Sequence, residues 1–167
     1  MPRLTPTSYV VLGLIDRIGP STPYDLKRGV AGGLGNLWSF PHTQLYTEPE
    51  RLAGAGLLKE RREESGRRRK EYSLTAAGRR ALDAWREQPT AESTELRDIA
   101  LLKVFLGADP RAMAEMQLDT HRRKLAEYEA IKEADTGGEP RGPWQALDAG
   151  IGHEREWIRF WSRLAEG

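Results

Sequence analysis

The sequence predicts a mainly α-helical protein with a small β-hairpin, an α+β fold in two parts. Apolar residues recur at helical spacing over most of the chain, two short extended segments flank a polar tip, and a Gly/Pro-rich loop separates two long amphipathic stretches near the C-terminus. The 167 residues, 38% of them hydrophobic, suffice for one compact core and an extension. We therefore expect an N-terminal domain over residues 1–88 and a helical region over residues 89–167.

The N-terminal part is expected to contain three helices, a hairpin and a fourth helix. Capping residues, helix-initiating prolines and glycine or proline stops set the expected spans. The five segments are a helix after Pro6 that stops at Gly19, a helix from Pro23 to Val30, a helix from Ser39 through Pro41 to Gly54, hairpin strands over 57–62 and 69–74, and a helix from Thr75 to Gln88. Pro49 lies inside the third helix and is expected to bend it.

The C-terminal part is expected to be helical throughout. Residues 99–106 are apolar on almost every side, which requires burial against several elements. Two longer helices, 111–134 and 144–164, flank a loop over 136–143, and each carries an apolar stripe, as expected for an antiparallel helical hairpin. We expect these stripes to be left uncovered by the small domain and to form a homodimer interface through Leu118, Leu125, Tyr128, Trp144, Leu147, Ile151, Ile158 and Trp161.

Composition excludes several classes of function. Without cysteine, the chain cannot form disulfides, use a catalytic thiolate or bind metal through sulfur. His153 and Glu154 begin like a zinc-binding helix, but Trp157 stands where the second histidine ligand is required, and no glycine-lysine-serine/threonine phosphate loop occurs. We therefore expect no enzyme activity and no cofactor. No apolar run is long enough to span a membrane and no signal peptide is visible, so a cytoplasmic protein is expected.

The charge distribution indicates a polyanionic partner. The net charge is +5 over residues 1–88 and −4 over residues 89–167, which together give the overall +1. Four consecutive cations, Arg67, Arg68, Arg69 and Lys70, lie on the return limb of the expected hairpin. Cations neutralise phosphates and release their counterions, so we expect this hairpin to contact the DNA backbone. Taken alone, the hairpin also fits a solvated edge strand protected by charge.

The third predicted helix carries polar side chains at its N-terminal turns. Gln44 and His42 are expected to approach base edges, whereas Tyr46 and Ser39 are expected to hold the DNA backbone. Three helices followed by a cationic hairpin make up a winged helix-turn-helix. The full set of expected DNA-binding residues is Tyr24, Lys27, Ser39, His42, Thr43, Gln44, Tyr46, Arg67, Arg68, Arg69 and Lys70.

Several short motifs in residues 8–88 resemble the PadR family of bacterial repressors. In family order they are Gly13-Leu14-Ile15, Pro23-Tyr24-Asp25-Leu26-Lys27, Trp38-Ser39, Gln44-Leu45-Tyr46, Arg51-Leu52, Gly56-Leu57-Leu58 and Tyr72-Ser73-Leu74-Thr75-Ala76-Ala77-Gly78. The resemblance implies a winged helix-turn-helix, a helical C-terminal dimerisation region, and a homodimer on inverted-repeat operators that a small effector often releases. Two departures are Ser21-Thr22-Pro23, in place of a small turn with His-Gly, and Pro49, where a leucine is common.

Other interpretations remain open. A winged-helix module that binds only proteins has the same fold, but such a module has little need for four consecutive cations on its hairpin. An enzyme acting on a small molecule is a third and more distant alternative. The five tryptophans fit either ordinary packing or a pocket for a small apolar or aromatic effector.

Overall fold

The computed structural model describes residues 3–35, 38, 41, 43–62, 69–134 and 141–166. The chain divides into two compact units, Met1–Glu92 and Ser93–Gly167. The division falls in an exposed stretch, a few residues after the position 88 that the sequence suggests.

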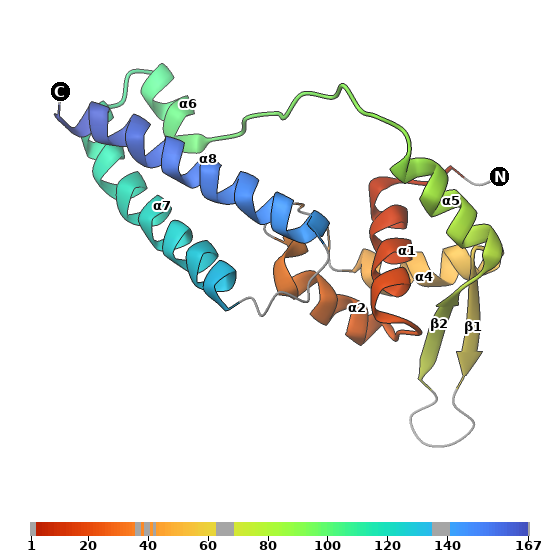
Figure 1. The fold of residues 1–167 in the computed structure, drawn as a ribbon. Helices are drawn as coiled ribbons and strands as arrows, with labels where there is room; N and C mark the ends of the chain where they lie inside the picture. The colour runs from red at the N-terminus through yellow and green to blue at the C-terminus, as the bar shows by residue number, and fades with distance from the viewer. Residues whose placement is uncertain are drawn as a thin grey trace. The chain divides into compact units, whose positions relative to one another are not determined.

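The N-terminal unit has the predicted order of three helices, a hairpin and a fourth helix (Figure 1). Its elements are α1 (Pro6–Ile18), α2 (Pro23–Gly29), the π-helical turn η1 (Val30–Leu34), α4 (Gln44–Gly54), β1 (Leu58–Arg62), β2 (Lys70–Leu74) and α5 (Ala76–Arg86). Threonines cap three of the helices. Thr5 and Thr22 form reciprocal capping boxes before a proline in the first turn, and Thr75 accepts a hydrogen bond from the amide of Gly78.

The core of this unit surrounds α1, which is buried over much of its circumference. Val11, Leu12 and Ile15 are at most 2% exposed. Their partners come from every other element of the unit and include Leu26, Leu45, Leu52, Leu58, Tyr72 and Leu82. Each such side chain contributes about 1.5 to 3 kcal/mol through its burial, so this cluster fixes the positions of α4 and the hairpin.

Helix α4 begins later than predicted. Pro41 lies outside the helix, and its carbonyl accepts a hydrogen bond of 2.9 Å from the amide of Gln44. Pro41 and Thr43 are exposed, so core packing does not stabilise an earlier helical turn there. The helix continues through Pro49, whose ring is fully buried. Ser39, predicted to cap this helix, lies outside the described residues.

The predicted hairpin is present, and its strands pair in antiparallel register, from Leu58 opposite Leu74 to Arg62 opposite Lys70. Ser21 adds an isolated bridge to this sheet through two backbone hydrogen bonds with Tyr72, each 2.9 Å long. The link between α1 and α2 is thereby held to β2. The tip of the hairpin, residues 63–68, lies outside the described residues.

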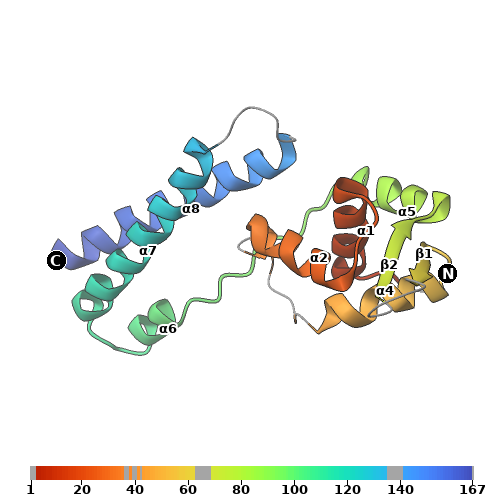
Figure 2. The same ribbon diagram turned by 90° about the horizontal axis from the view of Figure 1, so that it is seen from below.

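The C-terminal unit contains α6 (Ile99–Phe105), α7 (Pro110–Glu133) and α8 (Arg141–Glu166). Helices α7 and α8 pack side by side, as both ribbon views show (Figures 1 and 2). Helix α8 begins at Arg141 rather than Trp144, and Pro143 is tolerated because it lies in the first turn. None of the helices in the described ranges is long and apolar enough to cross a bilayer.

The apolar stripes of α7 and α8 cover one another, which corrects the expectation that they are left for a partner. Four of the expected interface residues are buried within the chain itself: Leu118, Tyr128, Ile151 and Trp161. The other four, Leu125, Trp144, Leu147 and Ile158, are half-buried. The small residue Gly150 allows the Tyr128 ring to pack closely, since a Cβ at position 150 would lie 3.0 Å from it.

Helix α6 is not buried on several sides within this chain, contrary to the prediction. Only Ala100 is fully covered, whereas Ile99 is 67%, Leu102 51% and Phe105 86% exposed. The short helix packs one side against α7 and leaves the other side in solvent. Apolar content predicts that a surface is covered, but it does not indicate which chain covers it.

Candidate nucleic-acid interface

Helix α4 divides into three faces with different surroundings. Leu45, Pro49 and Leu52, spaced by four and three residues, form the buried face that packs in the core. Residues at this spacing lie along one side of a helix, so the two remaining sets of residues face elsewhere.

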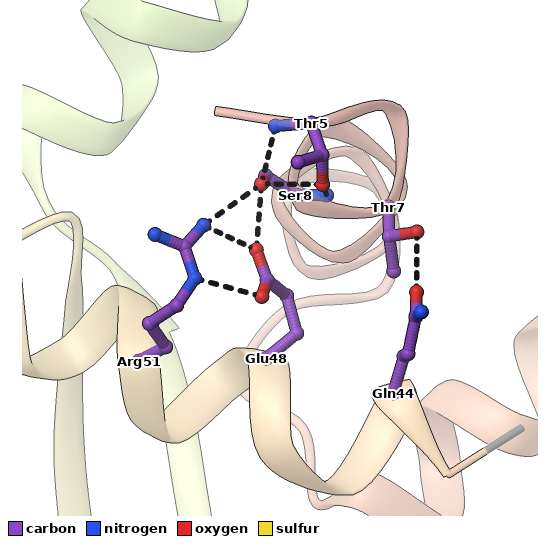
Figure 3. Close-up of polar contacts among 6 residues, drawn as sticks. All are labelled: Thr5, Thr7, Ser8, Gln44, Glu48 and Arg51. Atoms are coloured by element: carbon purple, nitrogen blue, oxygen red, sulfur yellow. Dashed lines mark hydrogen bonds and ion pairs between the residues drawn. The ribbon is translucent and has the colours of Figure 1, made fainter. Parts of the chain in front are cut away.

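The second face, Gln44, Glu48 and Arg51, contacts the N-terminus of α1 (Figure 3). The Thr7 hydroxyl donates a 2.8 Å hydrogen bond to Oε1 of Gln44. The Ser8 hydroxyl donates a 2.6 Å hydrogen bond to Oε1 of Glu48. We call these contacts between α1 and α4 the clamp.

Arg51 completes the clamp. Its Nε and Nη2 donate to the two carboxylate oxygens of Glu48 at 2.9 and 2.6 Å, and Nη2 also donates to the Ser8 hydroxyl at 3.0 Å. Ser8 Oγ additionally accepts a 2.8 Å hydrogen bond from the amide of Thr5. One fully buried hydroxyl therefore joins the cap of α1 to an ion pair of α4.

The clamp keeps Glu48 ionised. Burial raises the pKa of the Glu48 carboxyl, but the hydrogen bonds from Arg51 and Ser8 outweigh burial and hold its pKa below the usual 4.5. The hydrogen bonds to Glu48 in turn raise the pKa of Arg51. Because the folded state favours the charged carboxylate, the clamp stabilises the folded unit most at neutral pH.

Acid is therefore expected to weaken the clamp. The contribution of Glu48 is present above its unfolded pKa and is lost as the pH falls through its lowered folded pKa, below 4.5. We expect Glu48→Gln to reduce stability at neutral pH and to lose less stability than the wild type between about pH 5 and pH 3. Urea unfolding at a series of pH values measures this, with Glu87→Gln on an exposed carboxylate as the control. Parallel pH profiles for the wild type and Glu48→Gln would contradict the assignment.

The third face of α4 is exposed. It consists of Thr43, Tyr46, Thr47 and Glu50, at positions i, i+3, i+4 and i+7. Tyr46 is 49% exposed. Thr43 precedes the helix but its side chain makes no capping hydrogen bond. This face of the N-terminal unit presents hydroxyl groups to solvent.

Glu50 connects the third face to the hairpin. Its carboxylate lies 2.5 Å from Nζ of Lys70 on β2, and Glu60 on β1 lies 3.6 Å from the same ammonium group. The hydrogen bond to Glu50 raises the pKa of Lys70, so the lysine is firmly charged. Lys70, predicted to bind phosphate, is thus held between the hairpin and α4.

The other predicted DNA-binding residues are dispersed over the unit. Tyr24 and Lys27 are exposed on α2, Tyr24 by 63%, and Arg69 is exposed just before β2. His42, Arg67 and Arg68, like Ser39, lie outside the described residues. Sequence reasoning missed the clamp. The common face of Gln44, Glu48 and Arg51 is visible in their spacing, but their partners on α1 are not.

The C-terminal unit holds a second polar cluster between its long helices. His121 of α7 and Glu154 of α8 are joined by a 2.6 Å hydrogen bond, and both side chains are at most 14% exposed. The Trp157 ring stacks on His121 and lies edge-on to His153. Nearby, Leu125 and Ile158 line a shallow groove of about 420 Å³ with Arg155 and Arg159.

Each of the two units matches a known protein family. Residues 11–84 match the transcriptional regulator PadR-like family, and residues 96–166 match the virulence activator alpha C-terminal family. The negative transcriptional regulator PadR of Bacillus subtilis (strain 168) is 34% identical over 101 residues, which are 58% of this chain and 54% of that protein. The chain thus spans about half the length of this curated relative.

Solved structures share the fold. Bacillus subtilis PadR in complex with operator DNA has a TM-score of 0.83 at 24% identity, over 96% of this chain and 98% of that chain. The same protein in complex with p-coumaric acid has a TM-score of 0.78 at 24% identity, over 95% and 96%. The first unit, with its winged helix-turn-helix order of elements, is thus similar over residues 11–84 to the PadR-like family of transcriptional regulators.

Proposed function

We propose that this protein is a sequence-specific DNA-binding transcriptional regulator that acts as a homodimeric repressor on an inverted-repeat operator. The exposed hydroxyl-bearing face of α4 carries the proposal, since it lies beside a cationic hairpin in a winged helix-turn-helix unit. Hydroxyl groups hydrogen-bond to base edges and phosphates, and a helix of this kind fits the major groove. The curated relative is a negative regulator, which favours repression.

The hairpin supplies the sequence-independent part of the binding. Arg61 pairs with Glu71 at 2.8 Å and Arg62 with Glu60 at 2.8 Å, and both arginines are more than 60% exposed. Exposed ion pairs of this type contribute at most about 1 kcal/mol, so these arginines exchange their partners for phosphates at little cost. Arg69 adds to this surface, and the sequence supplies two further cations directly before it, Arg67 and Arg68.

Dimerisation is proposed through the C-terminal unit. The exposed side of α6, with Ile99, Leu102 and Phe105, is an apolar surface that a second copy would cover. In a two-fold dimer, two α4 helices enter successive major grooves about 34 Å apart, which requires an inverted repeat. A small aromatic or apolar effector is proposed to release the DNA, because the structural neighbour from Bacillus subtilis binds p-coumaric acid.

Selection of DNA from a random pool by the purified protein tests this function. We expect an inverted repeat to be enriched, and its affinity to fall steeply with salt because each phosphate contact adds about 0.9 to the slope of log affinity against log salt. Replacing Arg67, Arg68 and Arg69 with alanine is expected to flatten this slope. If no sequence is enriched, the protein is not a specific regulator. An unchanged salt slope would remove the hairpin from the interface.

A further inference from the structure

Resting on the proposed DNA-binding function, we propose that Thr43 and Thr47 read the bases, whereas Gln44 is a positioning residue that fixes the orientation of α4. The sequence alone favours Gln44 as the base-reading residue, because a glutamine side chain can pair with adenine through both its oxygen and its nitrogen. The contacts of α4 assign the two roles differently.

The amide oxygen of Gln44 is already used inside the protein. It accepts the hydrogen bond from Thr7, whose side chain is buried, with only 8% of the residue exposed. A two-point contact with adenine would require Oε1 to accept from the base and Nε2 to donate to it. Turning the amide into a groove would leave the buried Thr7 hydroxyl without its acceptor, which destabilises the folded unit.

The rest of the clamp prevents α4 from rotating to release Gln44. One helical turn further along, Glu48 and Arg51 bind the Ser8 hydroxyl of α1. On the neighbouring face, Leu45 and Leu52 are completely buried in the core. Helix α4 is therefore held on two of its three faces, and only the third face is free to enter a groove.

The two threonines of the free face have the chemistry to read sequence. Thr43 and Thr47 are one turn apart and exposed, and within the described part of the chain neither hydroxyl is engaged by a hydrogen bond. A threonine hydroxyl donates to or accepts from a base edge, and its methyl group packs against the methyl of thymine. Tyr46 lies between them and is placed to hold the backbone.

The experiment compares the full-length protein with single variants on the selected operator, on all of its single-base substitutions and on random DNA. We expect Thr47→Ala and Thr43→Ala each to weaken operator binding about 5- to 100-fold, to leave binding to random DNA nearly unchanged, and to relax the base preference at one position of each half-site. Thr47→Val keeps the methyl group and is expected to retain a preference for thymine. Thr90→Ala, on an exposed residue outside the helices, is the matched control.

Gln44 is tested by two variants with opposite effects on the clamp. Gln44→Ala is expected to lower the thermal unfolding midpoint and to weaken binding to operator and random DNA by the same factor. Gln44→Glu keeps an acceptor for Thr7 and is expected to restore the midpoint without changing which bases are preferred. A base-reading residue would instead shift its preference from adenine towards cytosine in this variant.

The outcomes separate this inference from the proposed function. If the wild type enriches no sequence, the function itself is wrong. If the wild type selects an operator and both threonine variants keep its full base preference, the assignment of Thr43 and Thr47 is overturned. A change of base preference at one position in either Gln44 variant overturns the positioning role.

Discussion

Replacing Gly78 with alanine is expected to destabilise the N-terminal unit by at least about 3 kcal/mol. This value is at the upper end of the losses that overpacked substitutions typically cause. A Cβ at this position would lie 2.1 Å from the carbonyl oxygen of Leu57 and 3.1 Å from the side chain of Leu74. The same carbonyl accepts hydrogen bonds from the amide and the hydroxyl of Thr75, at 3.2 and 2.9 Å. The backbone cannot move away without breaking the link between the hairpin and α5.

Urea unfolding followed by circular dichroism measures this effect. Gly54→Ala is the matched control, because Gly54 is also helical and a Cβ there would meet no atom within 4 Å. We expect the control to be neutral or slightly stabilising, since alanine is the better helix former. An unchanged midpoint for Gly78→Ala would mean that α5 and the hairpin are not packed as closely as described.

Replacing Trp161 with alanine is expected to destabilise the C-terminal unit by about 3 to 5 kcal/mol. The indole is 0% exposed and packs with Ala114 and Leu118 of α7 and Ala100 of α6. It also stacks on Trp157, with ring centroids 6.3 Å apart. Its Nε1 has no hydrogen-bond partner among the described residues, so the expected loss comes from apolar packing. Native-state hydrogen exchange of the α7 and α8 amides measures it.

Phe105→Ser provides the contrasting variant. Phe105 is 86% exposed, so its replacement is expected to change the stability of the chain by no more than about 0.5 kcal/mol. If a second copy covers α6, the same variant weakens the dimer in sedimentation experiments. Equal losses of exchange protection for both variants would contradict the assignment of Trp161 to the core of its own chain.

The sequence by itself determined the order of the elements and most of their boundaries. Thr75 before a helical pattern, and prolines in the first turns of α1 and α2, are local signals that act on the nearest backbone groups. The hairpin was predictable for the same reason, because its two extended segments and polar tip lie within one short stretch. Capping and periodicity depend only on residues that are near one another in the chain. The sequence alone therefore shows both.

Only the tertiary structure decided which side chains are free to act. The sequence favours Gln44 for base contacts, but Thr7, which lies 37 positions away in the chain, donates a hydrogen bond to its side chain. The sequence predicts burial for Phe105 and an uncovered interface position for Trp161, yet Trp161 is packed against α7 and Phe105 is exposed. Hydrogen bonding and burial depend on residues distant in the sequence and brought close by folding, so spacing along one helix cannot reveal them.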